Sequence, residues 1–162
     1  MLRVIAAVVL AITAGATPAA AATTDAVRSA IAAGIAAVRD RAGVAALAPD
    51  ATLDAIARAH SEDQVKRGYR GHRDPQGRGS QARVLAAMPD FCCRTGENIG
   101  LWGSSDPIAE ADAAEIATDI VGRWLASPPH RANLLSLDFD RYGLGVAFDG
   151  DDVVVTLAFA GP

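Results

Sequence analysis

The sequence predicts a mixed α/β domain of the α+β class, in which helices pack on a small antiparallel sheet. Three observations support this class. Apolar residues recur at helical spacing near the start of the chain and again within residues 104–127. A mostly apolar stretch at 95–102 has the character of a buried strand. The chain closes on two apolar runs separated by the turn sequence "DGDD".

Two helices are expected in the first half of the chain. The first carries an apolar stripe and ends near Gly43. The second follows Asp50 and is closed by Gly68, because glycine readily takes the left-handed conformation that ends many helices. The loop "GYRGHRDPQGRGS" comes next, and its four glycines place His72 on irregular backbone. The stripe of the first helix consists of Val27, Ile31, Ile35 and Val38.

A short helix and a strand form the middle of the predicted fold. Ser80 suits the cap of a helix that runs through Ala87. The segment Thr95 to Trp102 follows as the strand. It contains one charged residue, Glu97, between Gly96 and Asn98.

The clearest helical pattern lies within residues 104–127. Asp106 suits the cap of this helix and Pro107 suits its first turn. Pro128 and Pro129 end it, because the residue before a proline is pushed out of helical geometry.

A further short helix and a hairpin complete the predicted fold. Ser127 suits the cap of the new helix, so that His130 lies in its first turn. Two strands, Tyr142 to Phe148 and Val153 to Phe159, follow and are joined by the turn at 149–152.

Residues 1–22, "MLRVIAAVVLAITAGATPAAAA", have the composition of a secretory signal peptide. One cationic residue, Arg3, precedes an apolar stretch, and cleavage is expected after Ala22. An uncleaved membrane anchor is the alternative, although the strongly apolar part is short for a span. The sequence therefore predicts a secreted or cell-envelope protein whose domain covers residues 23–162 and has no membrane span.

The charge balance argues against nucleic acid as a partner. The chain has 15 basic and 19 acidic residues, a formal net charge of −4 with histidine neutral, and no basic run that could follow a phosphate backbone. The motifs HExxH and GxSxG and a phosphate-binding glycine loop do not occur in the sequence.

The only two cysteines, Cys92 and Cys93, are neighbours in the sequence. An oxidising compartment would permit a disulfide between them. Neighbouring Cα atoms lie about 3.8 Å apart, however, which is shorter than the roughly 4.4–6.8 Å of ordinary disulfides. The sequence leaves open a strained ring or two free thiols, and the spacing excludes a metal site of the CxxC kind.

The three histidines differ in their surroundings. His60 falls on the apolar face of its helix, so we expect it to be packed and hydrogen bonded. His72 lies in the glycine-rich loop, where no packing role is obvious, and it is a candidate for a functional site. His130 lies at the positive end of its helix, which disfavours protonation and keeps the ring neutral.

Glu97 is a further candidate for the functional site, because it is a charged residue in an apolar strand. Burying an unpaired carboxylate costs several kcal/mol. If buried, it needs hydrogen-bond donors, and histidines and backbone N–H groups are the obvious ones. Exposure to water on a strand edge is the alternative. We expect Glu97 to meet His72 and His130 in one shared site.

Six segments carry a family resemblance. In chain order they are "LAPDATLDAIARAHSEDQ", "GHRDP", "TGENIG", "IVGRWLASPPHRANLL", "YGLGVAF" and "TLAFA". They resemble the bacterial branch of the CAP superfamily, which comprises cysteine-rich secretory proteins, antigen 5 and pathogenesis-related 1 proteins, also called the SCP-like domain. The resemblance covers about residues 31–162.

The resemblance implies a three-layer α-β-α sandwich, an exported or cell-envelope location, and a groove whose floor carries histidines and glutamates. His72, Glu97 and His130 match the groove positions. His72 and His130 would then be the ligands of a divalent metal such as zinc. Structural support of the groove is implied for Trp124, Ser127, Arg131 and Asn133.

The chain departs from the family pattern at two groove positions. Ser127 stands where the eukaryotic-type pattern has a second glutamate. The strand sequence "RYGLGV" lacks the histidine of the family's GHYTQ segment. The four-residue cavity of histidines and glutamates is therefore not carried over whole.

Three functions follow for the trio of His72, Glu97 and His130. A secreted, non-enzymatic binding module would hold a small ligand, a lipid or a metal ion, or would meet an extracellular protein. A metal-dependent, peptidase-like hydrolase would use the trio to bind zinc and activate water. A structural exported domain would use it as a hydrogen-bond network. The trio includes no evident nucleophile, which favours the binding module.

Overall fold

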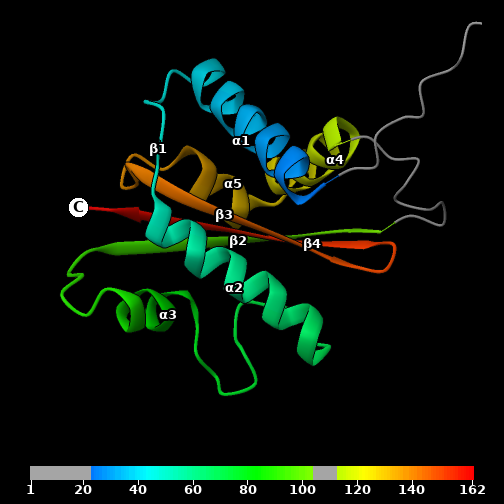
Figure 1. Ribbon diagram of the computed structural model, residues 1–162. Helices are drawn as coiled ribbons and strands as arrows, with labels where there is room; N and C mark the ends of the chain where they lie inside the picture. The colour runs from blue at the N-terminus through cyan, green and yellow to red at the C-terminus, as the bar shows by residue number, and fades with distance from the viewer. Residues whose placement is uncertain (1–22, 104–112) are drawn as a thin grey trace, which may run out of the picture.

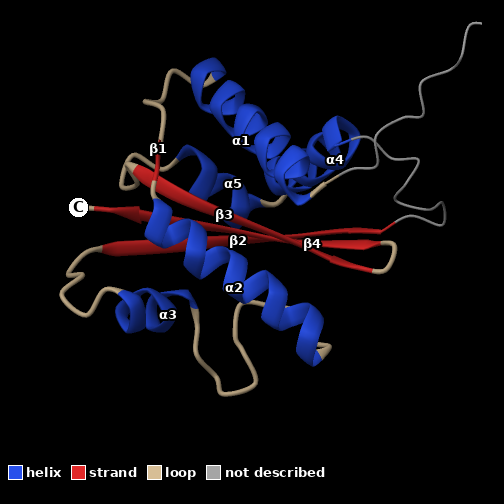
Figure 2. Cartoon of the chain, viewed as in Figure 1, coloured by secondary structure: helices blue, strands red, loops and turns tan. Residues whose placement is uncertain are grey.

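The computed structural model describes residues 23–103 and 113–162, which form a sandwich of three layers (Figure 1). Helices cover both faces of the sheet, as the colouring by secondary structure shows (Figure 2). This confirms the predicted mixed α/β sandwich. The upper layer in these views consists of α1 (Thr24–Arg41), α4 (Ala113–Ala126) and α5 (Pro128–Leu135), and the lower layer of α2 (Ala51–Arg67) and α3 (Ser80–Ala87).

Within the described residues the sheet has four strands, in the order β1-β3-β4-β2. The long strands β2 (Arg94–Gly103), β3 (Arg141–Asp149) and β4 (Asp152–Gly161) pair in antiparallel fashion, as predicted. The two-residue strand β1 (Ala48–Pro49) pairs in parallel with β3 and was not predicted. Strand β2 therefore lies at one edge of the sheet.

The ends of α2 follow the predicted signals. The side chain of Asp50 accepts hydrogen bonds from the backbone N–H groups of Thr52 and Leu53, at 2.8 and 3.0 Å. Gly68 follows the last turn in the left-handed conformation, with φ of 66°. Asp50 therefore fixes the start of α2, and Gly68 fixes its end and the start of the loop that carries His72.

The predicted cap of α3 is wrong. Gly79, rather than Ser80, has the extended backbone of a cap residue, and Ser80 is already the first helical residue. Ser127 does occupy the cap position of α5, but its side chain makes no capping hydrogen bond.

Several predictions lie outside the described residues. They are the signal peptide at 1–22 and the roles of Asp106 and Pro107 at the start of α4. Among the helices that the structure does describe, none is long and apolar enough to cross a membrane.

The main core lies between the sheet and the layer of α1, α4 and α5. Trp124 is almost fully buried there, and its Nε1 donates a hydrogen bond to the backbone oxygen of Ile99 at 2.9 Å. This bond ties α4 to the edge strand β2. A smaller core on the opposite face contains Leu53, Ala57, Val84, Ala158 and Ala160.

Helix α2 lies so close to β3 that only glycine fits beneath it. A Cβ atom on Gly143 would lie 2.0 Å from the carbonyl carbon of Leu53. A Cβ atom on Gly145 would lie 2.2 Å from the carbonyl carbon of Ala57. The sequence "GLG" therefore allows close packing of α2 on the sheet, which positions the loop beyond the C-terminal end of that helix.

Candidate functional site

The loop between α2 and α3 is held in place by polar contacts. The side-chain oxygen of Gln64 accepts a hydrogen bond from the backbone N–H of Gly71 at 3.0 Å. His60 Nε2 lies 3.1 Å from the backbone oxygen of Gly71, and His60 is buried, which confirms its predicted packed and hydrogen-bonded state. Asp74 Oδ1 accepts from the N–H groups of Gln76 and Arg78, both at 2.9 Å. His72 is thus placed by fixed neighbours on either side.

The carboxylate of Glu97 lies in the middle of this site. Glu97 is 9% exposed on β2, so exposure to water is excluded as an account of this side chain. Its Oε1 lies 2.9 Å from His72 Nδ1, and its Oε2 accepts a close hydrogen bond from Arg83 Nη2. Each oxygen of the buried carboxylate therefore has its own donor.

Arg83 is the partner that the sequence analysis missed. It lies on α3, with 11% of its side chain exposed. Its Nη1 also donates to the backbone oxygens of His72 and Arg78, at 3.1 and 2.9 Å. One guanidinium therefore links α3, the loop and the edge strand. The signal that could have found it is its position as the sole cation in the predicted helix 80–87.

His130 reaches the same region from α5, on the other side of the sheet's edge. The centroids of the His72 and His130 rings lie 6.1 Å apart. Among the described residues His130 makes no hydrogen bond to Glu97, whose second oxygen is taken by Arg83 instead. Glu97 therefore pairs directly with the ring of His72, and the ring of His130 is a neighbour of His72.

Two asparagines tie α5 to β2 behind the rings. Asn98 is fully buried, and its Nδ2 donates to the backbone oxygen of His130 at 3.0 Å. Asn133 Nδ2 donates to Asn98 Oδ1 at 2.9 Å and to the backbone oxygen of Glu97 at 3.2 Å. This network fixes the start of α5, and with it the backbone of His130, against the strand that carries Glu97.

The pKa values of the two rings are shifted in opposite directions. The hydrogen bond with Glu97 raises the pKa of His72 above its ordinary value of 6.5. Partial burial, followed by the nearby charge of His72, lowers the pKa of His130 below the same value. The site therefore shifts the pKa values of the two neighbouring rings apart.

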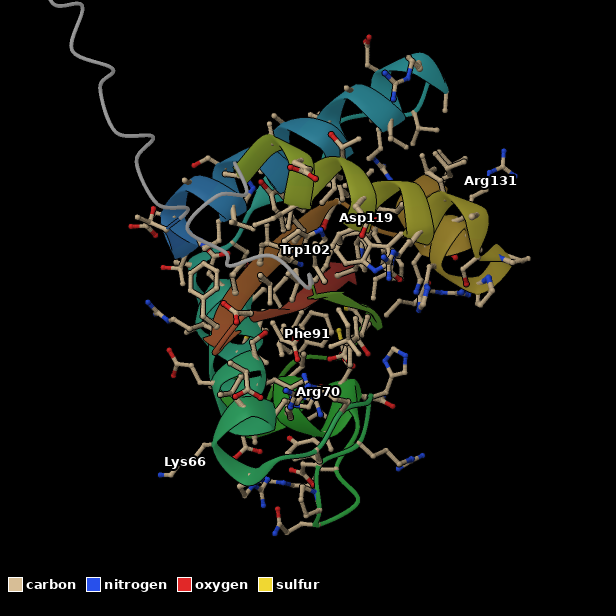
Figure 3. The ribbon with its side chains drawn as sticks, turned by 90° about the vertical axis from the view of Figure 1, so that its right-hand side faces the viewer. Lys66, Arg70, Phe91, Trp102, Asp119 and Arg131 are labelled. Carbon is tan, nitrogen blue, oxygen red and sulfur yellow. The ribbon has the colours of Figure 1, made fainter. Side chains whose placement is uncertain are left out.

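The residues implied to support the groove differ in what they contact. Trp124 and Asn133 make the hydrogen bonds to β2 described above, and Ser127 begins α5. The side chain of Arg131 is exposed, makes no hydrogen bond or ion pair within the described residues, and projects from α5 away from the sheet (Figure 3). The structure therefore shows no side-chain contact through which Arg131 would support the groove.

Both cysteines are free thiols, so the strained ring is not formed in this structure. Their Sγ atoms lie 2.8 Å apart in the turn that leads into β2. Cys92 is exposed and Cys93 is half-buried.

The described residues do not fit a zinc centre. They contain no group of three histidine, cysteine, aspartate or glutamate side chains placed to hold a metal ion. Both oxygens of Glu97 already face donors, and a ring with a raised pKa favours a proton over a metal. The ring of His72 is therefore better described as a hydrogen-bonding partner of Glu97 than as a metal ligand.

Comparisons with known sequences identify the family. A model described as CAP, the cysteine-rich secretory protein family, matches residues 33–159. The protein YkwD of Bacillus subtilis (strain 168) is 29% identical over 112 residues, which are 69% of this chain and 39% of YkwD. This chain therefore matches about two fifths of the length of that relative.

Solved structures share the fold. An extracellular protein containing an SCP domain from Bacillus anthracis is 25% identical, with a TM-score of 0.66 over 86% of this chain and 41% of that one. An outer surface protein from Borrelia burgdorferi is 19% identical, with a TM-score of 0.69 over 83% of this chain and 92% of that one. The second likeness shows the fold alone. Since the family model matches most of the chain, this protein belongs to the CAP superfamily of cysteine-rich secretory proteins.

Proposed function

We propose that this chain is a binding module rather than a catalyst, and that His72 and His130 hold an anionic or hydrogen-bond-accepting group of a small ligand or lipid. One observation carries the proposal: each oxygen of Glu97 is engaged, by His72 and by Arg83. A carboxylate engaged in this way orients a ring. Its ion pair with Arg83 favours the charged form of the carboxylate, which supports an orienting role over that of a general base.

The exposed ring supplies the recognition chemistry. With Nδ1 hydrogen bonded to Glu97, His72 keeps Nε2 as its remaining donor, on a side chain that is 54% exposed. The raised pKa of His72 favours the positive charge that an anion requires. His130, with a lowered pKa, adds a neutral imidazole that can donate or accept.

We also propose that the protein acts in the cell envelope or outside the cell. The signal-like composition of residues 1–22 supports this location. Two of its structural neighbours are described as an extracellular protein and an outer surface protein. Partners would then be small ligands, lipids or extracellular proteins.

Binding of inorganic phosphate tests the anion site in its simplest form. In an NMR titration, the ring signals of His72 and His130 should shift in a saturable manner. The affinity should fall as the pH rises through the raised pKa of His72, because the ring then loses its charge. His72→Ala should abolish the saturable shifts, and the buried ring of His60 is an internal control.

Two results would overturn the proposal. A phosphate titration that is unchanged in His72→Ala would place the anion elsewhere. Hydrolysis of an unstructured protein substrate by the purified protein, lost in Glu97→Gln, would show that the site is catalytic.

A further inference from the structure

A second pocket, of about 310 Å³, lies between α2, α3 and the loop that joins them. Of the two residues whose side chains contact the Glu97 carboxylate, only Arg83 belongs to the wall of this pocket. Much of the wall is apolar, and the apolar side chains are those of Ile56 and Ala59 on α2 and Ala86 on α3. This volume is at the lower end of small-molecule sites, so the pocket suits a short apolar group.

The acidic groups of the pocket wall are already satisfied. Asp63 Oδ2 accepts hydrogen bonds from Arg67 and from the hydroxyl of Tyr69, the latter at 2.7 Å. Asp74 accepts from two backbone N–H groups and from Arg78 Nε, the last at 2.7 Å. Neither carboxylate therefore needs a cation from a ligand.

The basic groups of the wall keep unused donors. The guanidinium of Arg78 bonds Asp74 through Nε alone, and its two Nη atoms have no partner among the described residues. The Arg78 side chain is 58% exposed. Arg83 is mostly buried, and its Nε has no hydrogen-bond partner in the described part of the chain. Leaving a buried guanidinium N–H without a partner costs free energy. A ligand with a hydrogen-bond acceptor near Arg83 Nε would remove this cost.

The remaining polar wall residue, His60, has partners already. Its Nε2 lies 3.1 Å from the backbone oxygen of Gly71, and its Nδ1 lies 3.3 Å from the hydroxyl of Tyr69. Burial lowers the pKa of His60, so this ring adds no positive charge of its own. The spare donors of the wall are therefore guanidinium groups.

We propose that this pocket is a binding site for a small amphiphilic carboxylate. The apolar part of the ligand packs on Ile56, Ala59 and Ala86, and its carboxylate is held at the guanidinium groups of Arg78 and Arg83. Guanidinium is the side-chain group that best matches a carboxylate, because its N–H groups pair with both oxygens. The wall of this pocket contains neither His72 nor His130, and it shares only Arg83 with the groups that contact Glu97.

Three probes of equal chain length test the charge preference. The full-length protein is titrated with octanoate, octylammonium and octanol below their micelle concentrations, and backbone amide signals are followed by NMR. Octanoate should produce saturable shifts at Ala59, Arg83 and Ala86. Octanol should bind more weakly, and octylammonium should produce no saturable shifts there.

Matched variants test the location. Ala86→Trp fills the pocket and should raise the Kd of octanoate at least about tenfold, whereas Ala55→Trp, at an exposed position of α2 outside the pocket wall, should leave it unchanged. Arg78→Gln should raise the Kd about tenfold, which corresponds to the loss of one charge-assisted hydrogen bond. Octanoate binding should persist in His72→Ala, which separates this site from the proposed anion site.

Any of three outcomes would contradict the proposal. They are the absence of saturable shifts around the pocket, an octanoate affinity that Ala86→Trp leaves unchanged while the variant remains folded, and octylammonium binding as tight as that of octanoate.

Discussion

Glu97 has two partners of different kinds. Arg83 contributes a guanidinium, whereas His72 contributes an imidazole that can gain or lose a proton. Because Arg83 stays charged, the buried carboxylate keeps an ionic partner whichever form His72 takes. His72 can therefore change its charge without leaving Glu97 unpaired.

Removing Arg83 should destabilise the protein strongly. Arg83→Met leaves a carboxylate with 5% of its side chain exposed without its ionic partner. Breaking a buried pair in this way costs about 3 kcal/mol. Urea denaturation should show this loss in the free energy of unfolding.

Arg58→Met is the matched control for that measurement. Arg58 is exposed on α2, and its side chain has no hydrogen bond or ion pair within the described residues. Its replacement should change the free energy of unfolding by less than about 0.5 kcal/mol. Equal effects of the two substitutions would show that the pair between Arg83 and Glu97 contributes nothing to stability.

The need of Glu97 for donors was predictable from sequence, but the identity of one donor was not. A charged residue in an apolar strand requires partners, and His72 is one of them. Arg83 lies fourteen residues earlier, on a helix whose apolar spacing does not indicate which strand residue its side chain meets. Such a contact depends on how α3 lies across β2, which periodicity does not determine.

At the scale of the elements, close packing of α2 on β3 positions the loop that carries His72. Gly145→Ala should disturb it, because the new Cβ would lie 2.2 Å from the backbone of Ala57 and the helix would have to move. We expect a loss of more than about 2 kcal/mol in the free energy of unfolding. Amide signals of residues 68–79 should also shift.

Gly122→Ala provides a control of opposite sign. Gly122 lies within α4, and a Cβ atom there would have no heavy atom within 4 Å. Alanine is favoured over glycine inside a helix by roughly 0.5–1 kcal/mol, so this variant should be slightly more stable. A Gly145→Ala protein as stable as Gly122→Ala would refute the packing argument.

Most elements were predictable because their signals are local. The stripe of α1, the ends of α2 and the turn of the terminal hairpin each lie within a few neighbouring residues. Strand β1 was not predictable, since its two residues form a strand only by pairing with β3. The cap of α3 was misassigned by one residue because Gly79 and Ser80 both suit such a position.

At the scale of the whole molecule, the site forms where the two helical layers meet around the open edge of the sheet. The loop below the sheet supplies His72, α5 above it supplies His130, and the edge strand β2 supplies Glu97. Motif spacing indicated the three residues, but only the sheet order explains their meeting. Arg131, one residue after His130, points in a different direction because successive side chains of a helix lie about 100° apart around its axis.

The central claim is that Glu97 and Arg83 place His72 next to His130, so that the pKa of His72 is raised and the pKa of His130 is lowered. A pH titration of the histidine ring signals by NMR tests it most directly. His72 should titrate above 6.5 and His130 below it, and His72→Gln should raise the pKa of His130. Titration of both rings at 6.5, with His130 unaffected by His72→Gln, would contradict the claim.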